Sequence, residues 1–162
     1  MALLAALVLV GINEVGHMRS QDAVRQRSQW QATRGTVNSL LQSMLDAETG
    51  QRGYLLTGND IDLQPYDKAM TALQSHMDTL RNQFVDSKDD MLMVALLSRQ
   101  ISRKLAEMEL SLRLRRQGNE DAWKFILHTD MGRENMDEIR KHAHALIERA
   151  TAKIQIGQAQ IV

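Results

Sequence analysis

Cysteine is absent from the 162 residues of this chain. Its absence excludes disulfide bonds, thiolate catalysis, zinc sites with cysteine ligands and covalently attached c-type haem. It also agrees with an oxidising compartment, where cytosolic thiol chemistry has no role.

Proline and aromatic residues are scarce. Pro65 is the one proline, and aromatic side chains make up 4% of the chain. Ten methionines and many Leu, Gln, Arg and Ala residues are present instead, and these residues favour helix over sheet. No stretch of useful length alternates as a strand does. We therefore predict an all-α protein, and 162 residues are enough for one domain with a hydrophobic core.

Neither sign of charge predominates. The 20 basic and 20 acidic side chains give a formal net charge of zero. A nucleic-acid-binding protein needs a basic surface that displaces the counterions around phosphates. The balance of charge therefore argues against a nucleic-acid partner.

Both ends of the chain are apolar. The segment Ala2–Ile12 carries no charge, and as a helix it would be about 16 Å long, roughly half of a bilayer core. No basic residue precedes it and no clear cleavage site follows, so it is a poor complete signal peptide. We interpret residues 1–12 as the end of a transmembrane helix and residues 156–162 as the approach to a second one, with a helical domain at 13–155. The alternative is an apolar terminus left by a cleaved signal.

Apolar residues recur at helical spacing in four stretches. The predicted helices run to about Leu56, from about Leu63 to Val85, from the Asp86–Asp90 turn to Arg116, and from Asn119 onward as one helix. Their predicted buried positions are Trp30, Thr33, Val37, Leu40, Met44 and Ala47; Tyr66, Met70, Leu73, Met77, Leu80 and Phe84; Val94, Leu97, Ile101, Leu105, Met108 and Leu112; and Met136, Ile139, Ala143, Leu146 and Ala150.

Short turns join the four stretches, so neighbouring helices should be antiparallel. We predict an up-down-up-down four-helix bundle. The first and last helices are long enough to extend beyond the others as a stalk that points toward the membrane. The turn after the first helix then lies at the far tip, close to Trp123.

The densest stretch of the sequence, DAETGQRGYLLTGND, covers Asp46–Asp60. Gly50 and Gly53 lie inside predicted helix, where each costs about 1 kcal/mol relative to alanine. Because glycine lets another backbone or side chain approach closely, we predict tight packing at both positions. Gly58 is predicted to end the helix in the left-handed conformation. Tyr54 is predicted to be a core or half-buried aromatic residue with its hydroxyl at the wet edge.

Glu48 and Arg52 are four residues apart on the first helix, and two interpretations stay open. They form either an exposed pair of small energetic value or a partly buried pair that fixes this helix against its neighbours. The pairs Arg103–Glu107 and Glu109–Arg113 have the same spacing, and we predict that they mark solvated faces.

No motif of catalysis or phosphate binding is present. The chain contains neither HExxH nor the P-loop pattern, and no Ser, His and acidic residue occur in a nucleophile-like context. We therefore predict no catalytic residue, no metal and no cofactor, and we assign no ligand contacts. A metal or haem site built across helices, for example from His76 and a methionine, is an alternative.

The Asp46–Gly58 stretch resembles the signature of the third type of CHASE domain, the cyclase/histidine-kinase-associated sensory extracellular domains. LQPYDKA at Leu63–Ala69 and MDEIRKHAHAL at Met136–Leu146 also resemble this family, more weakly, and the likeness covers roughly 31–149. The motif residues are Asp46, Glu48, Thr49, Gly50, Gln51, Arg52, Gly53, Tyr54, Leu55, Leu56, Thr57 and Gly58. We expect them to lock the tip of the fold rather than to contact a ligand.

The resemblance implies a bacterial receptor. Such domains are helical, lie outside the cytoplasmic membrane between two transmembrane helices, and precede a histidine kinase, nucleotide cyclase or chemotaxis module in the same chain. The main hypothesis is a periplasmic sensory domain of a homodimeric histidine kinase that performs no chemistry itself. The alternatives are a helical docking module without a small-molecule ligand, the same domain on a diguanylate cyclase or chemoreceptor, and a bundle that binds a cofactor.

Overall fold

The computed structural model describes the backbone of residues 2–85, 87–129 and 131–159, and the side chains of residues 21, 24–85, 87–129 and 132–156. The elements are α1 (Ala2–Thr57), a 3-10 turn η1 (Asp60–Leu63), α2 (Gln64–Gln83), α3 (Lys88–Arg116), α4 (Glu120–His128) and α5 (Met131–Ala159). These described ranges contain no strand, so the all-α prediction is confirmed.

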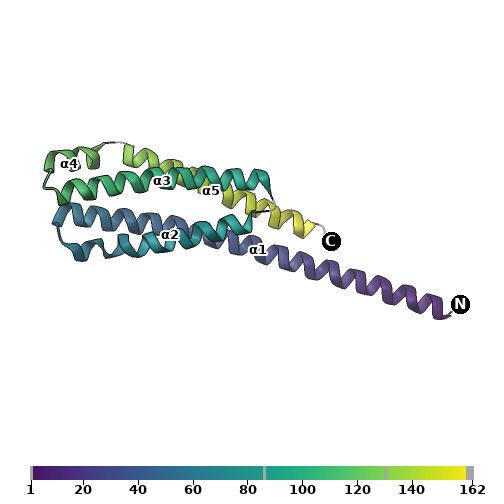
Figure 1. The fold of residues 1–162 in the computed structure, drawn as a ribbon. Helices are drawn as coiled ribbons and strands as arrows, with labels where there is room; N and C mark the ends of the chain where they lie inside the picture. Colours follow the sequence, from purple (N-terminus) through teal and green to yellow (C-terminus); the bar gives the residue numbers. More distant parts are fainter. Residues whose placement is uncertain (1, 86, 130, 160–162) are drawn as a thin grey trace.

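Four of the helices run side by side in alternating directions (Figure 1). Helix α1 packs chiefly against α2 and α5, whereas α3 packs against α5 and α4. The short α4 lies at the end of the bundle where α1 finishes. The predicted up-down-up-down bundle is therefore confirmed, with that end as its tip.

The last predicted helix is divided in two. Helix α4 ends at His128, and Thr129 follows in an extended conformation (φ −72°, ψ 146°). The Thr129 N–H still donates to the carbonyl oxygens of Phe125 and Ile126, which closes α4 before the chain restarts as α5. The prediction of one continuous helix after Asn119 was wrong, because the apolar spacing of α5 was extended backward across this break.

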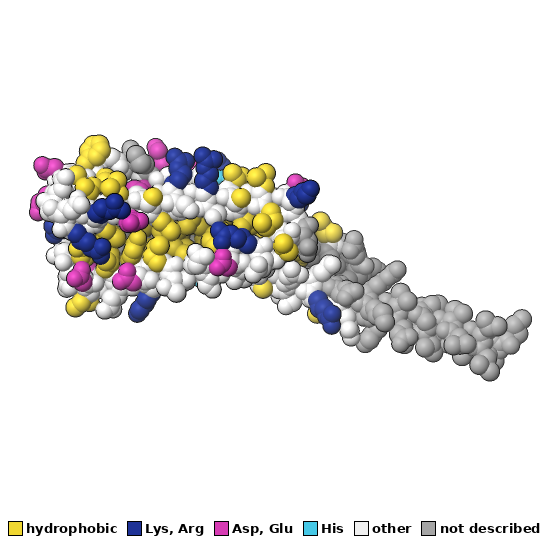
Figure 2. Space-filling view, in the orientation of Figure 1, with side chains coloured by type: hydrophobic (Ala, Val, Ile, Leu, Met, Phe, Trp, Pro, Cys, Tyr) yellow, Lys and Arg dark blue, Asp and Glu magenta, His cyan; other side chains and the backbone are white. Residues whose placement is uncertain are grey.

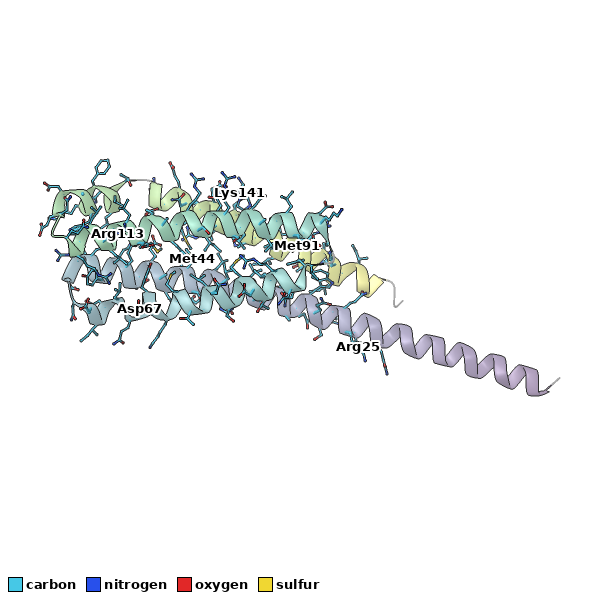
Figure 3. The ribbon with its side chains drawn as sticks, in the orientation of Figure 1. Arg25, Met44, Asp67, Met91, Arg113 and Lys141 are labelled. Carbon is cyan, nitrogen blue, oxygen red and sulfur yellow. The ribbon has the colours of Figure 1, made fainter. Side chains whose placement is uncertain are left out.

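The predicted apolar faces form the core. Most of the predicted positions are buried in one cluster that follows the length of the bundle, including Val37, Leu73, Leu97 and Ile139. Met44, labelled in Figure 3, lies between the helices with no exposed surface. Figure 2 shows hydrophobic side chains along the boundary between α3 and the α1–α2 pair.

A second, smaller cluster lies at the tip. It consists of Tyr54, Leu55, Leu63, Leu112 and Trp123, all of them buried. The expectations that Trp123 lies near the end of the first helix and that Tyr54 is a core residue are confirmed. The guanidinium of Arg116 lies 5.7 Å from the Tyr54 ring centroid, which covers the open side of this cluster.

Helices α1 and α5 both continue past the ends of α2 and α3 (Figure 1). The 56 residues of α1 correspond to about 84 Å, nearly twice the roughly 44 Å of the 29-residue α5. Across the described residues, no helix combines the length and apolar character that a membrane span needs. Most side chains of the predicted membrane segments, residues 1–12 and 156–162, lie outside the described residues, so these segments stay predictions.

Candidate functional site

The end of α1 folds as its sequence predicts. Gly58 adopts φ +71°, the left-handed region that glycine occupies without steric cost, and its N–H donates to the Tyr54 carbonyl oxygen at 2.7 Å. The Asn59 side chain then accepts a hydrogen bond from the Ile61 N–H and starts η1. The chain is thereby turned back within a few residues, and Pro65 occupies the first turn of α2 as expected.

Gly50 and Gly53 allow α2 and η1 to approach α1 closely. A Cβ added to Gly50 would lie 2.6 Å from the backbone nitrogen of Tyr66, a contact that no side-chain movement relieves. A Cβ on Gly53 would lie 3.3 Å from the Cβ of Asp62. The prediction of tight packing at both glycines is confirmed, and it explains why the sequence accepts their low helix propensity.

Glu48 and Arg52 form the predicted ion pair, with Nη2 of Arg52 3.1 Å from Oε1 of Glu48. The two side chains differ in exposure, since Arg52 is 57% exposed and Glu48 15%. The same Glu48 oxygen lies 3.4 Å from Nζ of Lys104 on α3. The pair therefore fixes α1 against a neighbour, as the second of the two open interpretations proposed, and it does so through Lys104.

Lys104 is the centre of a polar cluster that the sequence analysis missed. Its side chain is 2% exposed, and Nζ lies 3.2 Å from Oε1 of Glu107 and 3.1 Å from the carbonyl oxygen of Gly132. The Asn135 amide donates to the other Glu107 oxygen at 3.0 Å. The cluster of Glu48, Arg52, Lys104, Glu107 and Asn135, called the Lys104 cluster below, thus joins α1, α3 and the beginning of α5.

The sequence held one weak indication that Lys104 is buried, namely its spacing from buried residues of the same helix. Lys104 stands three residues after Ile101 and four before Met108, both buried, so it occupies a core position of α3. The neighbouring Leu105 was assigned to the core instead, and it is only partly buried. The prediction that Glu107 pairs with Arg103 on a solvated face was wrong, because Glu107 points inward to Lys104.

A buried hydrogen bond lies one helical turn further toward the tip. Nε2 of Gln51 donates to Oγ of Ser111 at 2.7 Å, and the Ser111 hydroxyl donates to the Met108 carbonyl oxygen at 2.6 Å. Gln51 and Ser111 are both buried, so this bond satisfies polar groups that water does not reach. The motif residue Gln51 therefore has a structural role between α1 and α3.

The remaining motif residues differ in their surroundings. Asp46 accepts from the Gln42 amide, and the Thr49 hydroxyl donates to the Leu45 carbonyl oxygen at 2.8 Å. The Thr57 hydroxyl lies within hydrogen-bond distance of the Asp62 carboxylate in η1. Leu55 is fully buried in the tip cluster, whereas Leu56 is exposed. The end of the motif thus shapes the turn, and Glu48, Gln51 and Arg52 line a cavity.

Two hollows adjoin the motif. A groove of about 610 Å³ runs between α1 and α2, with Gly50, Gly53, Pro65 and Ala69 in its walls. A more enclosed cavity of about 220 Å³ lies on the other side of α1. It is bordered by the Lys104 cluster, the end of α4 and the first turn of α5. We call this second hollow the tip cavity.

A second ionic cluster lies at the opposite end of the bundle. The carboxylate of Asp90 has no exposed surface and contacts Arg149 at 2.9 Å and Lys153, both on α5. Nζ of Lys153 also lies 4.2 Å from the ring centroid of Trp30 on α1, and Trp30 packs on Phe84. Burial alone raises the pKa of Asp90, but hydrogen bonds from Lys153, Ser87 and Arg149 outweigh it, so the pKa lies below its ordinary value.

No group of three or more acidic or histidine side chains within the described residues is placed to hold a metal ion. His142 lies 3.6 Å from Glu138 on the surface of α5. The tip cavity and the two ionic clusters offer charged groups and hydrogen bonds.

The family model of the CHASE3 domain matches residues 23–160. The chain belongs to this family. CHASE3 domains are extracellular sensor domains of membrane receptors, and they are input domains without catalytic activity. The resemblance inferred from Asp46–Gly58 is confirmed, and the match covers both ionic clusters.

The CHASE3 fold of this chain is similar to a solved structure, the crystal structure of the Rhodopseudomonas palustris histidine kinase HK9 sensor domain. The TM-score is 0.69 and the sequence identity 22%, and the similar part covers 78% of this chain and 98% of that chain. At this identity the likeness establishes the fold. A comparison with curated proteins found no match.

Proposed function

We propose that this CHASE3 domain is the periplasmic input domain of a bacterial sensor histidine kinase, that it works as a homodimer, and that the kinase module is in the same parent chain. The family assignment supports a receptor, and the fold likeness to a histidine kinase sensor domain supports a kinase among the receptor types. A stimulus at the tip changes the position of one long helix relative to the other, and the membrane helices carry this displacement inward.

The arrangement of α1 and α5 is the observation that carries this proposal. Both helices pass the ends of α2 and α3 at the end opposite the tip (Figure 1). Membrane helices continuous with them would be neighbours, so a small shift between α1 and α5 would reach the membrane directly. A displacement of packed rigid helices is a recurrent way to pass a signal over a long distance.

The Asp90 cluster fixes the position of α5 that this displacement would have to change. Lys153 contacts both the Asp90 carboxylate on α3 and the Trp30 ring on α1. Sliding α5 along α1 breaks these contacts unless Lys153 and Arg149 find new partners one helical turn away. Charged contacts of this kind favour a step between two arrangements over a continuous drift.

The side of the membrane is tested by chemical labelling. The chain has no cysteine, so Lys141→Cys in the whole receptor supplies a single thiol in this domain at an exposed site of α5 (Figure 3). A membrane-impermeant maleimide should label it in intact spheroplasts. Labelling that requires disruption of the inner membrane would contradict a periplasmic position.

The output is tested with the whole receptor in inverted membrane vesicles. We expect transfer of the γ-phosphate of ATP to a histidine of the receptor. Formation of cyclic diguanylate from GTP, or no nucleotide-dependent product at all, would replace the kinase by a cyclase or a chemoreceptor module. Sedimentation of the detergent-solubilised whole receptor tests the dimer, since a monomeric receptor would contradict the homodimer.

A further inference from the structure

The tip cavity has the size of a metabolite rather than of a drug. Its volume of about 220 Å³ equals roughly seven water molecules at about 30 Å³ each. Pockets for drug-sized ligands are larger, about 300–1,000 Å³. The cavity therefore suits a molecule with a carbon skeleton of two to four atoms and its polar groups.

The charges around the tip cavity favour an anion. Among the described residues that line it, Arg52, Lys104 and Arg133 are cationic, and Glu48 and Glu107 are anionic. The ammonium group of Lys104 already contacts Glu48, Glu107 and the Gly132 carbonyl oxygen. Arg52 contacts Glu48 through Nη2, and a guanidinium presents five N–H donors, so others remain for a ligand carboxylate.

Part of the wall of the tip cavity is apolar, because Ile126 and Leu127, from the last turns of α4, line it. This combination of a cationic wall and an apolar wall fits an anion that carries carbon, and an inorganic oxyanion would leave the apolar wall unused.

The Lys104 cluster is not explained by stability. A buried cation with two carboxylates contributes little or nothing over well-packed apolar side chains of similar volume, because removing charges from water costs several kcal/mol per ion. Most of the rest of the bundle interior is apolar, and Asp90, Gln51 and Ser111 are among the other buried polar residues. Gly132 also leaves room beside the cluster, since a Cβ there would lie 2.6 Å from Oε1 of Glu107 and 3.0 Å from Nζ of Lys104.

We propose that the tip cavity binds a small organic carboxylate of two to four carbons, with its carboxylate on Arg52 and its carbon chain against Ile126 and Leu127. This inference rests on the proposed sensory function in one respect, that the bound acid is the stimulus. The acid binds Arg52 donors that Glu48 does not use, and its negative charge beside Glu48 changes the contacts of Lys104. Because Lys104 holds the Gly132 carbonyl oxygen, this change reaches the first turn of α5.

The test uses the 162-residue chain with acetate, L-lactate and succinate as probes. Calorimetry and thermal unfolding at constant ionic strength should show saturable binding of at least one of them. The variant Arg52→Gln keeps the Glu48–Lys104 contact and should raise the Kd at least tenfold, since its side chain is exposed and its fold should be unchanged.

A matched control comes from α3. Arg113 also contacts an acidic residue four positions earlier, Glu109 at 3.0 Å, with both side chains exposed and away from the tip cavity. Arg113→Gln (Figure 3 shows this residue near the tip end of α3) should change the Kd less than twofold. An equal change of the Kd in Arg52→Gln and Arg113→Gln would contradict binding in the tip cavity, because binding would then depend on the total charge of the domain.

Three further outcomes decide the proposal. Binding of a carboxylate that phosphate and sulfate do not displace supports it. No heat and no shift of Tm with any probe up to 20 mM would overturn it, and so would equal binding of phosphate, because the apolar wall would then have no role. Failure of carboxylate binding leaves ATP-dependent phosphorylation by the receptor untouched, whereas absence of phosphorylation leaves the binding result standing, so the two proposals fail separately.

Discussion

Nε of Arg149 lies 2.9 Å from Oδ1 of Asp90, which fastens the second half of α5 to the first turn of α3. Lys153, one turn further along α5, contacts the other oxygen of the same carboxylate. One buried acidic side chain thus contacts two cations and holds the end of the bundle from which α1 and α5 continue.

Replacing Asp90 should destabilise the domain. In Asp90→Asn, the hydrogen bonds to Arg149 and Lys153 lose the negative charge of their acceptor, and the free energy of unfolding should fall by about 2–3 kcal/mol. The loss is no larger because both cations are partly exposed and can be hydrated again. Urea denaturation followed by circular dichroism measures it. The exposed pair Asp78–Arg81 supplies the control, since Asp78→Asn should change stability by less than about 0.5 kcal/mol. Equal effects of the two variants would show that the Asp90 contacts are not maintained in solution.

The same contact predicts a pH dependence. The pKa of Asp90 is lower in the folded state than in the unfolded chain, so its contribution is complete above the unfolded value of about 4 and is lost as the pH falls toward the folded value. The stability difference between the wild type and Asp90→Asn should therefore be constant from pH 7 to pH 5 and smaller at pH 3. A difference that grows on acidification would contradict the lowered pKa.

Replacing Lys104 alone should destabilise the domain more than replacing it together with Glu48 and Glu107. Lys104→Met leaves Glu48 and Glu107 without their buried cation, and we expect a loss of about 3–5 kcal/mol. The triple variant Lys104→Met, Glu48→Gln, Glu107→Gln removes the like charges and should recover about half of that loss. Denaturant titration of the single and triple variants measures the recovery. A triple variant less stable than Lys104→Met would show that the carboxylates have other buried partners.

Two glycines of α1 should respond to alanine in opposite directions. Gly50→Ala places a Cβ 2.6 Å from the Tyr66 backbone nitrogen and should destabilise by about 1–3 kcal/mol despite the better helix propensity of alanine. Gly35→Ala has nothing within 4 Å of the new Cβ and should stabilise by about 0.5–1 kcal/mol. The Tm of each variant, compared with that of the wild type in thermal unfolding, measures both effects. A stabilised Gly50→Ala would mean that α2 does not approach α1 as closely as described.

The bundle could be predicted from the sequence, because the spacing of apolar residues within each helix shows which face is buried. Positions such as Leu73, Met77 and Leu80 repeat every three or four residues, and burial of one stripe per helix leaves few other arrangements. Gly58 could also be predicted, because it takes the positive φ that favours glycine at the end of a helix.

The polar cluster could not be predicted, because its partners are distant in sequence. Lys104 reaches a carboxylate on α1 and a carbonyl oxygen on α5, and neither contact has a spacing rule. A charged residue beside Leu105 is normally assigned to the surface, and only the packing of three helices places it inside. The break at Thr129 was missed for a related reason, since no proline marks it and the residues on both sides form helix.

The hydrophobic interior of the molecule consists of two separate clusters. The larger hydrophobic cluster reaches Ala47 on α1 and Met108 on α3, while the tip cluster begins at Tyr54 and Leu112. Between them lies a polar layer that includes the buried Gln51–Ser111 bond, and Tyr66 is the residue in contact with both clusters.

Two apolar compartments separated by a polar layer need not melt together. The tip, with the nine-residue α4 closed by Thr129, rests on the smaller compartment and can open while the rest of the bundle stays folded. Amide hydrogen exchange should then show α4 exchanging well before the middle of α3. In energetic terms the protein then consists of a stable shaft and a tip that opens separately, and the boundary between them runs through the Gln51–Ser111 layer.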